Sequence, residues 1–300
     1  MRYNCVMHGS RSSLPLLLLL AAASAWGDGA TNRRGTRRSG ERPASADRAG
    51  ARFGEEEGGE RISMQVKGVD RTALLFAPAQ APAEPGAPVV LVFHGHGGTA
   101  EDAARSFRLH RLWPEAAVCY MQGLTGTPGR YDSAGARSGW QKAPGQMGNR
   151  DVLFVDEMLT RIRERLKVDP GRVFALGHSN GSAFTYVLWN QRPDAFAAFC
   201  SAAAQNGKLI RESRPKSTFV IAGKQDRISP FETQMRTIEL LRELIEVDGS
   251  RATTAGLARS EPGIDGTTLV TYIHEGGHEF PEEALPLVVQ FFQRHRGATR

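Results

Sequence analysis

Residues 177–181 read Gly-His-Ser-Asn-Gly and come directly after a run of β-forming residues, Arg-Val-Phe-Ala-Leu, at 172–176. A helical pattern follows at 182–191. This order predicts a strand, a tight turn with Ser179 at its apex, and a helix that begins at once. The glycines are expected because a Cβ two positions to either side of the serine would collide with neighbouring backbone. Such a turn exposes the serine hydroxyl at the edge of the sheet, where it can act as a nucleophile.

Strand and helix patterns alternate along residues 61–300, which we expect to form a single domain. The alternation predicts an α/β domain with a mostly parallel sheet covered by helices on both faces. Asp151 is expected to cap the helix that begins there. Strands are expected at 62–66, 72–76, 88–93, 116–121, 172–176, 195–203, 218–222 and 267–274, and helices at 100–113, 151–166, 182–191, 231–246 and 281–294.

The first 25 residues are predicted to be a signal peptide. A mildly positive start precedes an apolar run at 14–23, and Ala-Ser-Ala at 23–25 supplies small residues for a cleavage site. The run is too short to span a bilayer permanently, which disfavours the alternative of an uncleaved anchor. Residues 26–60 have almost no large apolar side chains, so we expect a disordered linker. The protein is therefore expected to be secreted or periplasmic, with no stable membrane insertion after signal cleavage.

The charge and the cysteines narrow the classes of protein further. The net charge of +6 comes mainly from arginine, and no basic stretch is interleaved with aromatic residues, so nucleic acid is not an expected partner. Cys119 and Cys200 fall in predicted buried strands that are not neighbours in the expected sheet. A disulfide needs its two Cα atoms within about 7 Å. We therefore expect two free, buried thiols.

A nucleophilic serine needs a base to accept its proton and an acid to orient that base. Two histidines follow Ser179, at positions 274 and 278. His278 lies beyond the last strand in a Gly-Gly-His loop, from which a side chain can reach over the sheet edge. His274 ends the strand itself and is expected to pack in the interior. We therefore predict His278 as the base.

The acid is expected in the loop after strand 218–222, where Asp226 lies. Asp194 is the nearest rival, but it precedes a strand, where a role in a connecting turn explains it. Asp248 and Asp265 lie in polar loops at the wrong ends of their elements. Asp226 is predicted to hold the base in the tautomer that accepts the serine proton.

The negative charge that develops on a carbonyl oxygen needs preorganised donors, and two backbone amides are predicted to supply them. One is the amide of Asn180, next after the nucleophile. The other comes from the loop after strand 88–93, which reads His-Gly-His-Gly-Gly at 94–98, and we assign it to His96. The alternative for this loop is a plain strand-to-helix turn.

A metal site is the competing interpretation of residues 274–278, because His-Glu-Gly-Gly-His matches the His-Glu-x-x-His zinc pattern. That pattern works only on a helix, and two interior glycines cost about 2 kcal/mol of helix propensity relative to alanine. His94 and His96 form a second candidate pair but have no third ligand nearby in the sequence. We therefore expect no metal.

Trp140 lies in a long irregular segment, 123–149, and a segment of that length without secondary structure is usually functional. Its ring is predicted either to stack against a substrate ring or to fill the core beside the segment. The sequence leaves both alternatives open.

Six motifs together resemble the polyhydroxybutyrate depolymerase and feruloyl or acetylxylan esterase group of secreted α/β-hydrolases. The likeness runs from about residue 61 to residue 294. The group often has Cys at position 96, Met or Leu at 178, and Trp at 280. The motifs are His-Gly-His-Gly-Gly-Thr-Ala-Glu-Asp at 94–102, Arg-Asp-Val-Leu-Phe-Val at 150–155, Val-Asp-Pro-Gly-Arg-Val at 168–173, Gly-His-Ser-Asn-Gly at 177–181, Asp-Ala-Phe-Ala-Ala at 194–198 and Gly-Gly-His-Glu-Phe-Pro at 276–281.

The resemblance implies an α/β-hydrolase fold and a serine carboxylesterase that needs no cofactor. It places the nucleophile on Ser179, the acid on Asp226 and the base on His278. Because the group often has Trp where Phe280 stands, the resemblance also implies that Phe280 lies in the wall of the substrate pocket. The expected substrates are esters, either hydroxyalkanoate oligomers or acylated and feruloylated polysaccharides. A serine peptidase of the same fold and a non-catalytic binding protein on this scaffold are the alternatives.

Overall fold

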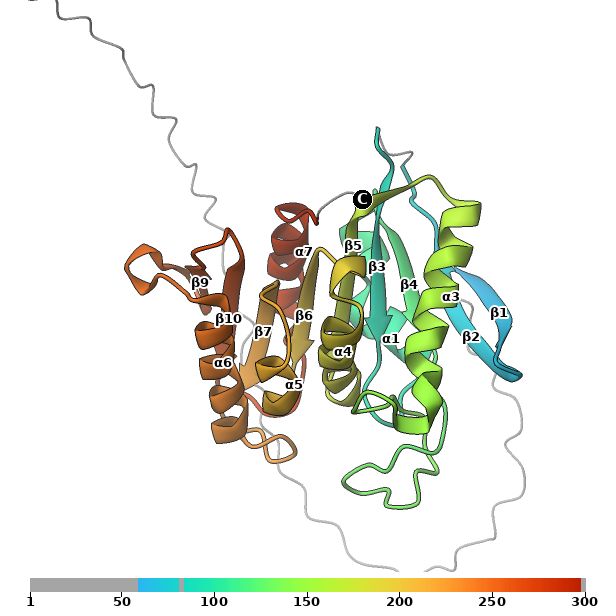
Figure 1. Ribbon diagram of the computed structural model, residues 1–300, viewed down its shortest axis with the longest axis horizontal. Coiled ribbons are helices and arrows are strands. Elements are labelled where there is room, and N and C mark those ends of the chain that lie inside the picture. The colour runs from blue at the N-terminus through green and yellow to red at the C-terminus, as the bar shows by residue number, and fades with distance from the viewer. Residues whose placement is uncertain (1–58, 81–83, 298–300) are drawn as a thin grey trace, which may run out of the picture. The chain divides into compact units, whose positions relative to one another are not determined.

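The computed structural model describes residues 59–80 and 84–297, and within them ten strands form one sheet (Figure 1). The strand order is β1-β2-β4-β3-β5-β6-β7-β10-β9-β8. The six strands from β4 to β10 in this order run parallel, and the pairs at both edges are antiparallel. The strands are β1 (Glu60–Val66), β2 (Val69–Phe76), β3 (Ala87–Phe93), β4 (Ala117–Met121), β5 (Val168–His178), β6 (Ala198–Ala202), β7 (Ser217–Gly223), β8 (Thr253–Ala255), β9 (Ala258–Pro262) and β10 (Thr268–His274).

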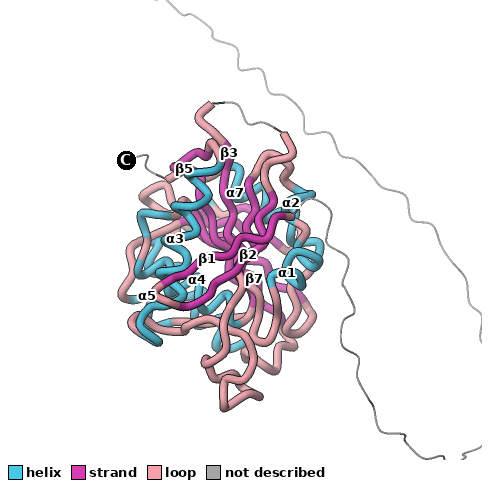
Figure 2. Tube along the Cα trace, turned by 90° about the vertical axis from the view of Figure 1, so that its right-hand side faces the viewer, coloured by secondary structure: helices cyan, strands magenta, loops and turns pink. Residues whose placement is uncertain are grey.

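Helices cover both faces of this sheet, as Figure 2 shows when the sheet is seen edge-on. Side chains of α3, α4, α5 and α6 pack in the core of one face, and side chains of α1, α2 and α7 pack in the core of the other. The predicted α/β fold with a mostly parallel sheet is therefore confirmed. The helices are α1 (Ala100–Phe107), α2 (Leu109–Leu112), α3 (Arg150–Arg165), α4 (Asn180–Gln191), α5 (Gly207–Arg211), α6 (Phe231–Ile245) and α7 (Leu285–Gln293), with short 3-10 turns η1 (Gln146–Asn149), η2 (Pro193–Ala195), η3 (Gly249–Arg251) and η4 (Glu282–Ala284).

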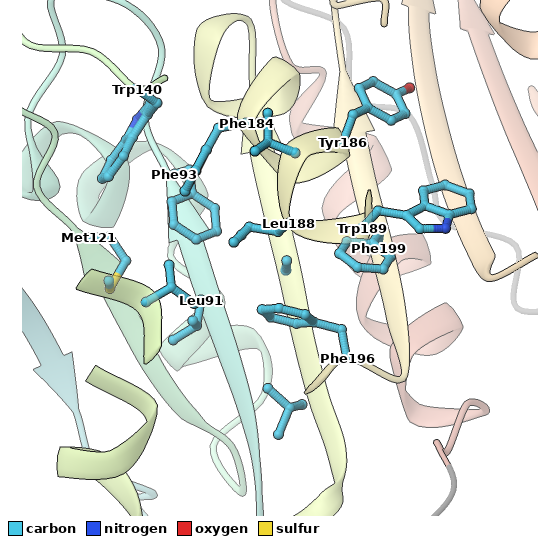
Figure 3. Close-up of a cluster of buried hydrophobic side chains, with 14 of the residues drawn as sticks. Leu91, Phe93, Met121, Trp140, Phe184, Tyr186, Leu188, Trp189, Phe196 and Phe199 are labelled. Carbon is cyan, nitrogen blue, oxygen red and sulfur yellow. The ribbon is translucent and has the colours of Figure 1, made fainter. Parts of the chain in front are cut away.

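Aromatic residues dominate the core between the sheet and α4 (Figure 3). The ring of Trp140 stacks on Phe184 with their centroids 5.4 Å apart, and both rings meet the edge or face of Phe93 on β3. Further along α4, Trp189 stacks on Phe199 of β6 at 5.4 Å. Aromatic pairs of this kind contribute about 1 kcal/mol each beyond the area that they bury. The helix that begins at the predicted nucleophile is thus fixed firmly to the sheet.

Two local predictions need correction. The predicted helix at 100–113 is two helices, because Arg108 adopts a left-handed conformation with φ 45° and ends α1. Asp151 does not cap α3, since the cap is Asn149 and the helix begins at Arg150. The carboxylate of Asp151 is instead buried in an ion pair with Arg71 of β2, at 2.9 Å. A buried carboxylate without a partner of opposite charge is strongly destabilising, and the ion pair with Arg71 removes that cost.

The predictions for the cysteines can be compared with the structure, whereas those for the N-terminal residues cannot. Cys119 on β4 and Cys200 on β6 are separated by two strands, and both are free and buried, as expected. The predicted signal peptide, 1–25, and nearly all of the predicted linker, 26–60, lie outside the described residues. Within the part that is described, no helix combines the length and apolar character needed to cross a bilayer.

Candidate active site

The loops that carry the predicted site leave the sheet at one edge. Strands β3, β5, β7 and β10 are parallel, so their carboxyl ends all point the same way. The His94 loop follows β3, Ser179 follows β5, Asp226 follows β7 and His278 follows β10. The ends of parallel strands are where open α/β sheets bind ligands.

Ser179 occupies the predicted tight turn between β5 and α4. Its backbone is held at φ 54° and ψ −119°, a conformation that a non-glycine residue rarely adopts and that costs about 1–3 kcal/mol. A Cβ on Gly181 would lie 2.2 Å from the carbonyl oxygen of Phe93, and a Cβ on Gly177 would lie 2.4 Å from the backbone of Gly181. The steric reason given above for both glycines is therefore confirmed.

The structure joins Ser179, His278 and Asp226 in a chain of hydrogen bonds. The Oγ of Ser179 lies 2.7 Å from Nε2 of His278, and Nδ1 of His278 lies 2.8 Å from Oδ2 of Asp226. A carboxylate only accepts, so Nδ1 carries a proton and donates it to Asp226. In the neutral ring Nε2 is then free to accept from the serine hydroxyl. This is the tautomer that proton removal from Ser179 requires.

Asp226 is buried, and four donors satisfy its carboxylate. Its Oδ1 accepts from the amides of Ile228 and Ser229, both at 2.8 Å. Its Oδ2 accepts from Nε2 of Gln234 at 3.0 Å as well as from His278. These bonds fix the carboxylate plane and stabilise its charge without exposing it to water. Nothing in the sequence pattern around Gln234, in the first turns of α6, marks it for this role.

The rival acids and the rival histidine lie outside this chain of hydrogen bonds. Asp194 lies in η2 and pairs with Arg214 at 3.0 Å. Asp248 and Asp265 accept hydrogen bonds from backbone amides two residues further on, as turn residues do. His274 ends β10 and is buried, as expected for a packing residue.

The glycine-rich loop after β3 lies against Ser179. A Cβ on Gly95 would stand 3.5 Å from the Cβ of Ser179. The amide of Asn180 belongs to the first residue of α4, where helix geometry leaves an N–H without an intrahelical partner. Within the described part of the chain, neither this amide nor that of His96 donates a hydrogen bond. Both residues line the same cavity as Ser179.

The side chain of His96 ties this loop to the long segment at 123–149. Its Nε2 lies 2.9 Å from Oδ2 of Asp132. Hydrogen bonds from the amides of Arg137 and Ala136, together with His96, lower the pKa of Asp132 to about 2. Asp132 is therefore an anion over the whole physiological range and holds the imidazole in place. The sequence analysis considered His96 as a backbone donor and as half of a metal pair, and gave no role to Asp132.

Trp140 is fully buried and does not line the cavity. Its indole N–H donates to the carbonyl oxygen of His94 at 3.0 Å. Its backbone N–H donates to Oδ1 of Asn180 at 2.7 Å, and its carbonyl accepts from Nδ2 of the same residue at 3.1 Å. Of the two alternatives, the core position is therefore the correct one, and the assignment of Trp140 to substrate contact is wrong. Burying this large aromatic ring against Phe184 of α4 is more favourable than exposing it to water.

Phe280 lines a cavity of about 660 Å³ that opens onto Ser179 and His278. Its ring meets the edge of Phe107 with centroids 5.0 Å apart. Phe280 thus lies in the wall of this cavity, and its contact with substrate stays a prediction. A cavity of this size accommodates a small ester or the end of a longer one.

The candidate metal ligands do not assemble. His274 ends a strand and His278 lies in a loop, so the two do not share the helix face that a zinc site of this pattern needs. The ring of His94 is already occupied on both sides, with Nδ1 2.7 Å from the Gly95 carbonyl oxygen and Nε2 accepting from the Gly123 amide at 3.0 Å. Among the described residues, no three His, Cys, Asp or Glu side chains group around one point.

No family model matches the sequence. The sequence is similar to the "putative esterase NocK" of Nocardia uniformis subsp. tsuyamanensis. The two are 32% identical over 178 residues, which are 56% of this chain and 48% of NocK. The chain thus spans about half the length of the curated relative that it matches.

Among solved structures, an acetyl xylan esterase from Aspergillus awamori superposes with a TM-score of 0.61 at 14% identity, covering 78% of this chain and 98% of that enzyme. A ferulic acid esterase superposes with a TM-score of 0.53 at 16% identity, covering 78% and 97%. The resemblance to acetylxylan and feruloyl esterases is confirmed at the level of fold, and its polyhydroxybutyrate depolymerase part stays a prediction. The chain therefore has the α/β-hydrolase fold and resembles the carboxylesterases built on it, acetyl xylan and ferulic acid esterases among them.

Proposed function

We propose that this protein is a serine hydrolase that cleaves carboxylic esters, with Ser179 as nucleophile, His278 as base and Asp226 as the orienting acid. The observation that carries the proposal is the unbroken chain of hydrogen bonds from Ser179 through His278 to Asp226, at 2.7 and 2.8 Å, at the end of a cavity. A site that only binds a ligand does not require a hydroxyl, an imidazole and a carboxylate linked in this order by hydrogen bonds.

In the proposed first step, Ser179 Oγ attacks the ester carbonyl carbon while Nε2 of His278 takes the hydroxyl proton. The ring then carries a positive charge, which the buried carboxylate of Asp226 stabilises through Nδ1–H. The strained backbone at Ser179 keeps the hydroxyl forward of the sheet, so the attack needs no large movement of the chain.

The attack puts a negative charge on the former carbonyl oxygen. We assign its two donors to the amides of His96 and Asn180. This assignment is supported by the place of both residues in the lining of the cavity and by the contact of Gly95 with Ser179. Removal of one such donor typically costs about 3 kcal/mol of transition-state stabilisation.

Collapse of the tetrahedral intermediate breaks the bond to the leaving alcohol, and His278 gives its proton to that oxygen. Water then attacks the acyl-serine, His278 takes a proton from this water, and the acid product leaves with Ser179 restored. Every proton in this cycle moves through Nε2 of His278, so the mechanism needs no metal or organic cofactor.

The proposed substrates are short hydroxyalkanoate oligomers or acyl and feruloyl esters of polysaccharides. The second group draws support from the two solved structures of this fold described above, which are an acetyl xylan esterase and a ferulic acid esterase. We also propose that the protein is exported, on the basis of the apolar run and small residues in its first 25 positions.

A panel of p-nitrophenyl acetate, p-nitrophenyl butyrate, methyl ferulate and a p-nitroanilide tests the proposal on wild type and Ser179→Ala. We expect hydrolysis of at least one ester by wild type and its loss in the variant, unaffected by chelator. Ser63→Ala, on the exposed face of β1, is the matched control and should keep full activity. Equal rates in wild type and Ser179→Ala would overturn the proposal. Cleavage of the anilide but of no ester would favour the peptidase alternative.

A further inference from the structure

Three basic side chains line the active-site cavity, and all of them come from the long segment at 123–149. They are Arg130, Arg137 and Lys142. The proposed ester chemistry uses none of them, although a segment of this length without regular structure usually serves a function.

The two carboxylates in the same lining are already satisfied within the protein. Asp132 accepts from His96 and from the amides of Ala136 and Arg137. Asp102 accepts the amide of Thr99 and pairs with Arg105 at the start of α1. Within the described part of the chain, neither carboxylate forms an ion pair with Arg130, Arg137 or Lys142.

Arg137 is the cation with the most freedom to bind a ligand. Its guanidinium makes no hydrogen bond or ion pair to any residue that the structure describes, and it retains five N–H donors in a planar fork. Arg130 uses one donor on the carbonyl oxygen of Ile228 at 2.9 Å. Lys142 uses one on the carbonyl oxygen of Pro128 at 2.6 Å, and burial lowers its pKa.

The backbone fixes Arg137 beside the loop that is proposed to stabilise the oxyanion. The amide of Gly97 donates to the carbonyl oxygen of Ser138 at 2.7 Å, and the hydroxyl of Ser138 donates to the carbonyl oxygen of Gly98 at 2.6 Å. A Cβ on Gly97 would stand 3.1 Å from Cδ of Arg137. The Arg137 side chain thus lies beside the loop that borders Ser179, although it belongs to the 123–149 segment.

We propose that the substrate carries a carboxylate beside its ester, and that Arg137, with Arg130 and Lys142, binds this carboxylate. A planar guanidinium matches a carboxylate in two parallel hydrogen bonds. Exposed apolar side chains of Tyr131 and Ile228 line the same cavity and suit the carbon chain between the two groups. The inference rests on the proposed esterase function and narrows its substrates to anionic esters.

The carboxylate can stand on either side of the scissile ester, and two substrate pairs distinguish the sides. Mono-p-nitrophenyl adipate and its methyl ester place it on the acyl side. 3-Acetoxybutyrate and its methyl ester place it on the alcohol side, as in a hydroxyalkanoate oligomer. The measured quantity is the preference, which is kcat/KM for the anionic ester divided by kcat/KM for its neutral partner.

We expect Arg137→Gln to lower the preference about tenfold in one pair, and Arg137→Glu to lower it further. Arg137→Lys should retain part of it, because the charge remains but the planar fork is lost. Arg163→Gln, on the exposed face of α3, removes a cation remote from the cavity and should leave the preference unchanged. The wild-type preference should also fall as sodium chloride rises from about 20 mM to about 500 mM, since salt screens the attraction.

The same preference in wild type, Arg137→Gln and Arg137→Glu for both pairs would overturn the inference while leaving the esterase function intact. Hydrolysis of no ester by wild type would overturn the proposed function and the inference together. Inhibition of wild type by adipate at concentrations that do not inhibit Arg137→Glu would support the inference with a carboxylate ligand that contains no ester.

Discussion

Nε2 of His178 lies 2.7 Å from the backbone carbonyl oxygen of His278. A carbonyl oxygen only accepts, so Nε2–H of His178 donates this bond. The residue before the nucleophile therefore holds the loop that carries the proposed base. The ring of His178 also contacts the opposite loop, since a Cβ on Gly95 would stand 3.3 Å from its Nδ1. His178 is thus a positioning residue between two loops of the site.

His178→Met removes this donor and substitutes a residue that the resembling esterases often have at this place. We expect kcat to fall about tenfold with little change in KM, because the base is displaced while the cavity is retained. His178→Gln keeps an N–H donor and should recover part of the loss. Equal kcat values for wild type and both variants would contradict a positioning role, and steady-state kinetics on one p-nitrophenyl ester decides.

The stability of the protein should depend on His178 between about pH 4 and pH 6.5. Burial, and then the neighbouring His278, lowers the pKa of His178 to about 4, whereas an unfolded histidine titrates near 6.5. In this window the unfolded chain binds more protons than the folded chain, so the free energy of unfolding falls as the pH falls. Between about pH 7.5 and about pH 5, wild type should lose about 2 kcal/mol more than His178→Gln.

Urea unfolding at the two pH values measures this difference. The other buried histidines are common to both proteins, so their contributions cancel in the comparison. Losses of equal size in wild type and His178→Gln would contradict the lowered pKa.

Asp226→Asn tests the orienting acid. An amide nitrogen cannot accept from Nδ1–H, so the substitution favours the wrong tautomer of His278 and should lower kcat by about four orders of magnitude. Asp194→Asn is the matched control, because Asp194 is the rival acid and lies in η2 in an ion pair with Arg214. Its kcat should equal that of wild type. A large loss in Asp194→Asn, or none in Asp226→Asn, would reverse the assignment.

Gly181→Ala tests the steric argument at the turn. The added Cβ would stand 2.2 Å from the carbonyl oxygen of Phe93, so strand and helix must separate, and we expect a loss of about 3 kcal/mol in the free energy of unfolding. Gly249→Ala is the control, since no atom lies within 4 Å of its added Cβ. Its unfolding free energy should change by less than about 0.5 kcal/mol. Similar values for the two variants in urea unfolding would contradict the argument.

Local patterns in the sequence predicted the parts of the molecule that depend on neighbouring residues. The turn at Ser179 needs glycines at fixed offsets, and parallel strands end at one edge, so the sequence also placed Asp226 and His278 at the same edge. The short strands β8 and β9 were missed, because all three residues of β8 are exposed and neither strand shows an alternating pattern. The five-residue helix α5 is too short to show a helical period.

Contacts between distant residues could not be predicted in this way. The pairing of Arg71 with Asp151 joins β2 to α3, which lie far apart in the sequence, and no local pattern indicates it. The same holds for Asp132 with His96 and for His178 with the carbonyl of His278. Each contact depends on how the 123–149 segment, or the loop that carries His278, packs against the rest of the protein. The spacing of residues in the sequence does not reveal that packing.

The most direct test of the account is intact-protein mass spectrometry after exposure to a fluorophosphonate, which phosphonylates only an activated serine. The account predicts one adduct per chain, located by peptide mapping to Ser179, and absent from Ser179→Ala. Labelling should be much slower in His278→Gln, because the hydroxyl then has no base to accept its proton. An unlabelled wild-type protein, or an adduct on another residue, would contradict the claim that His278 activates Ser179.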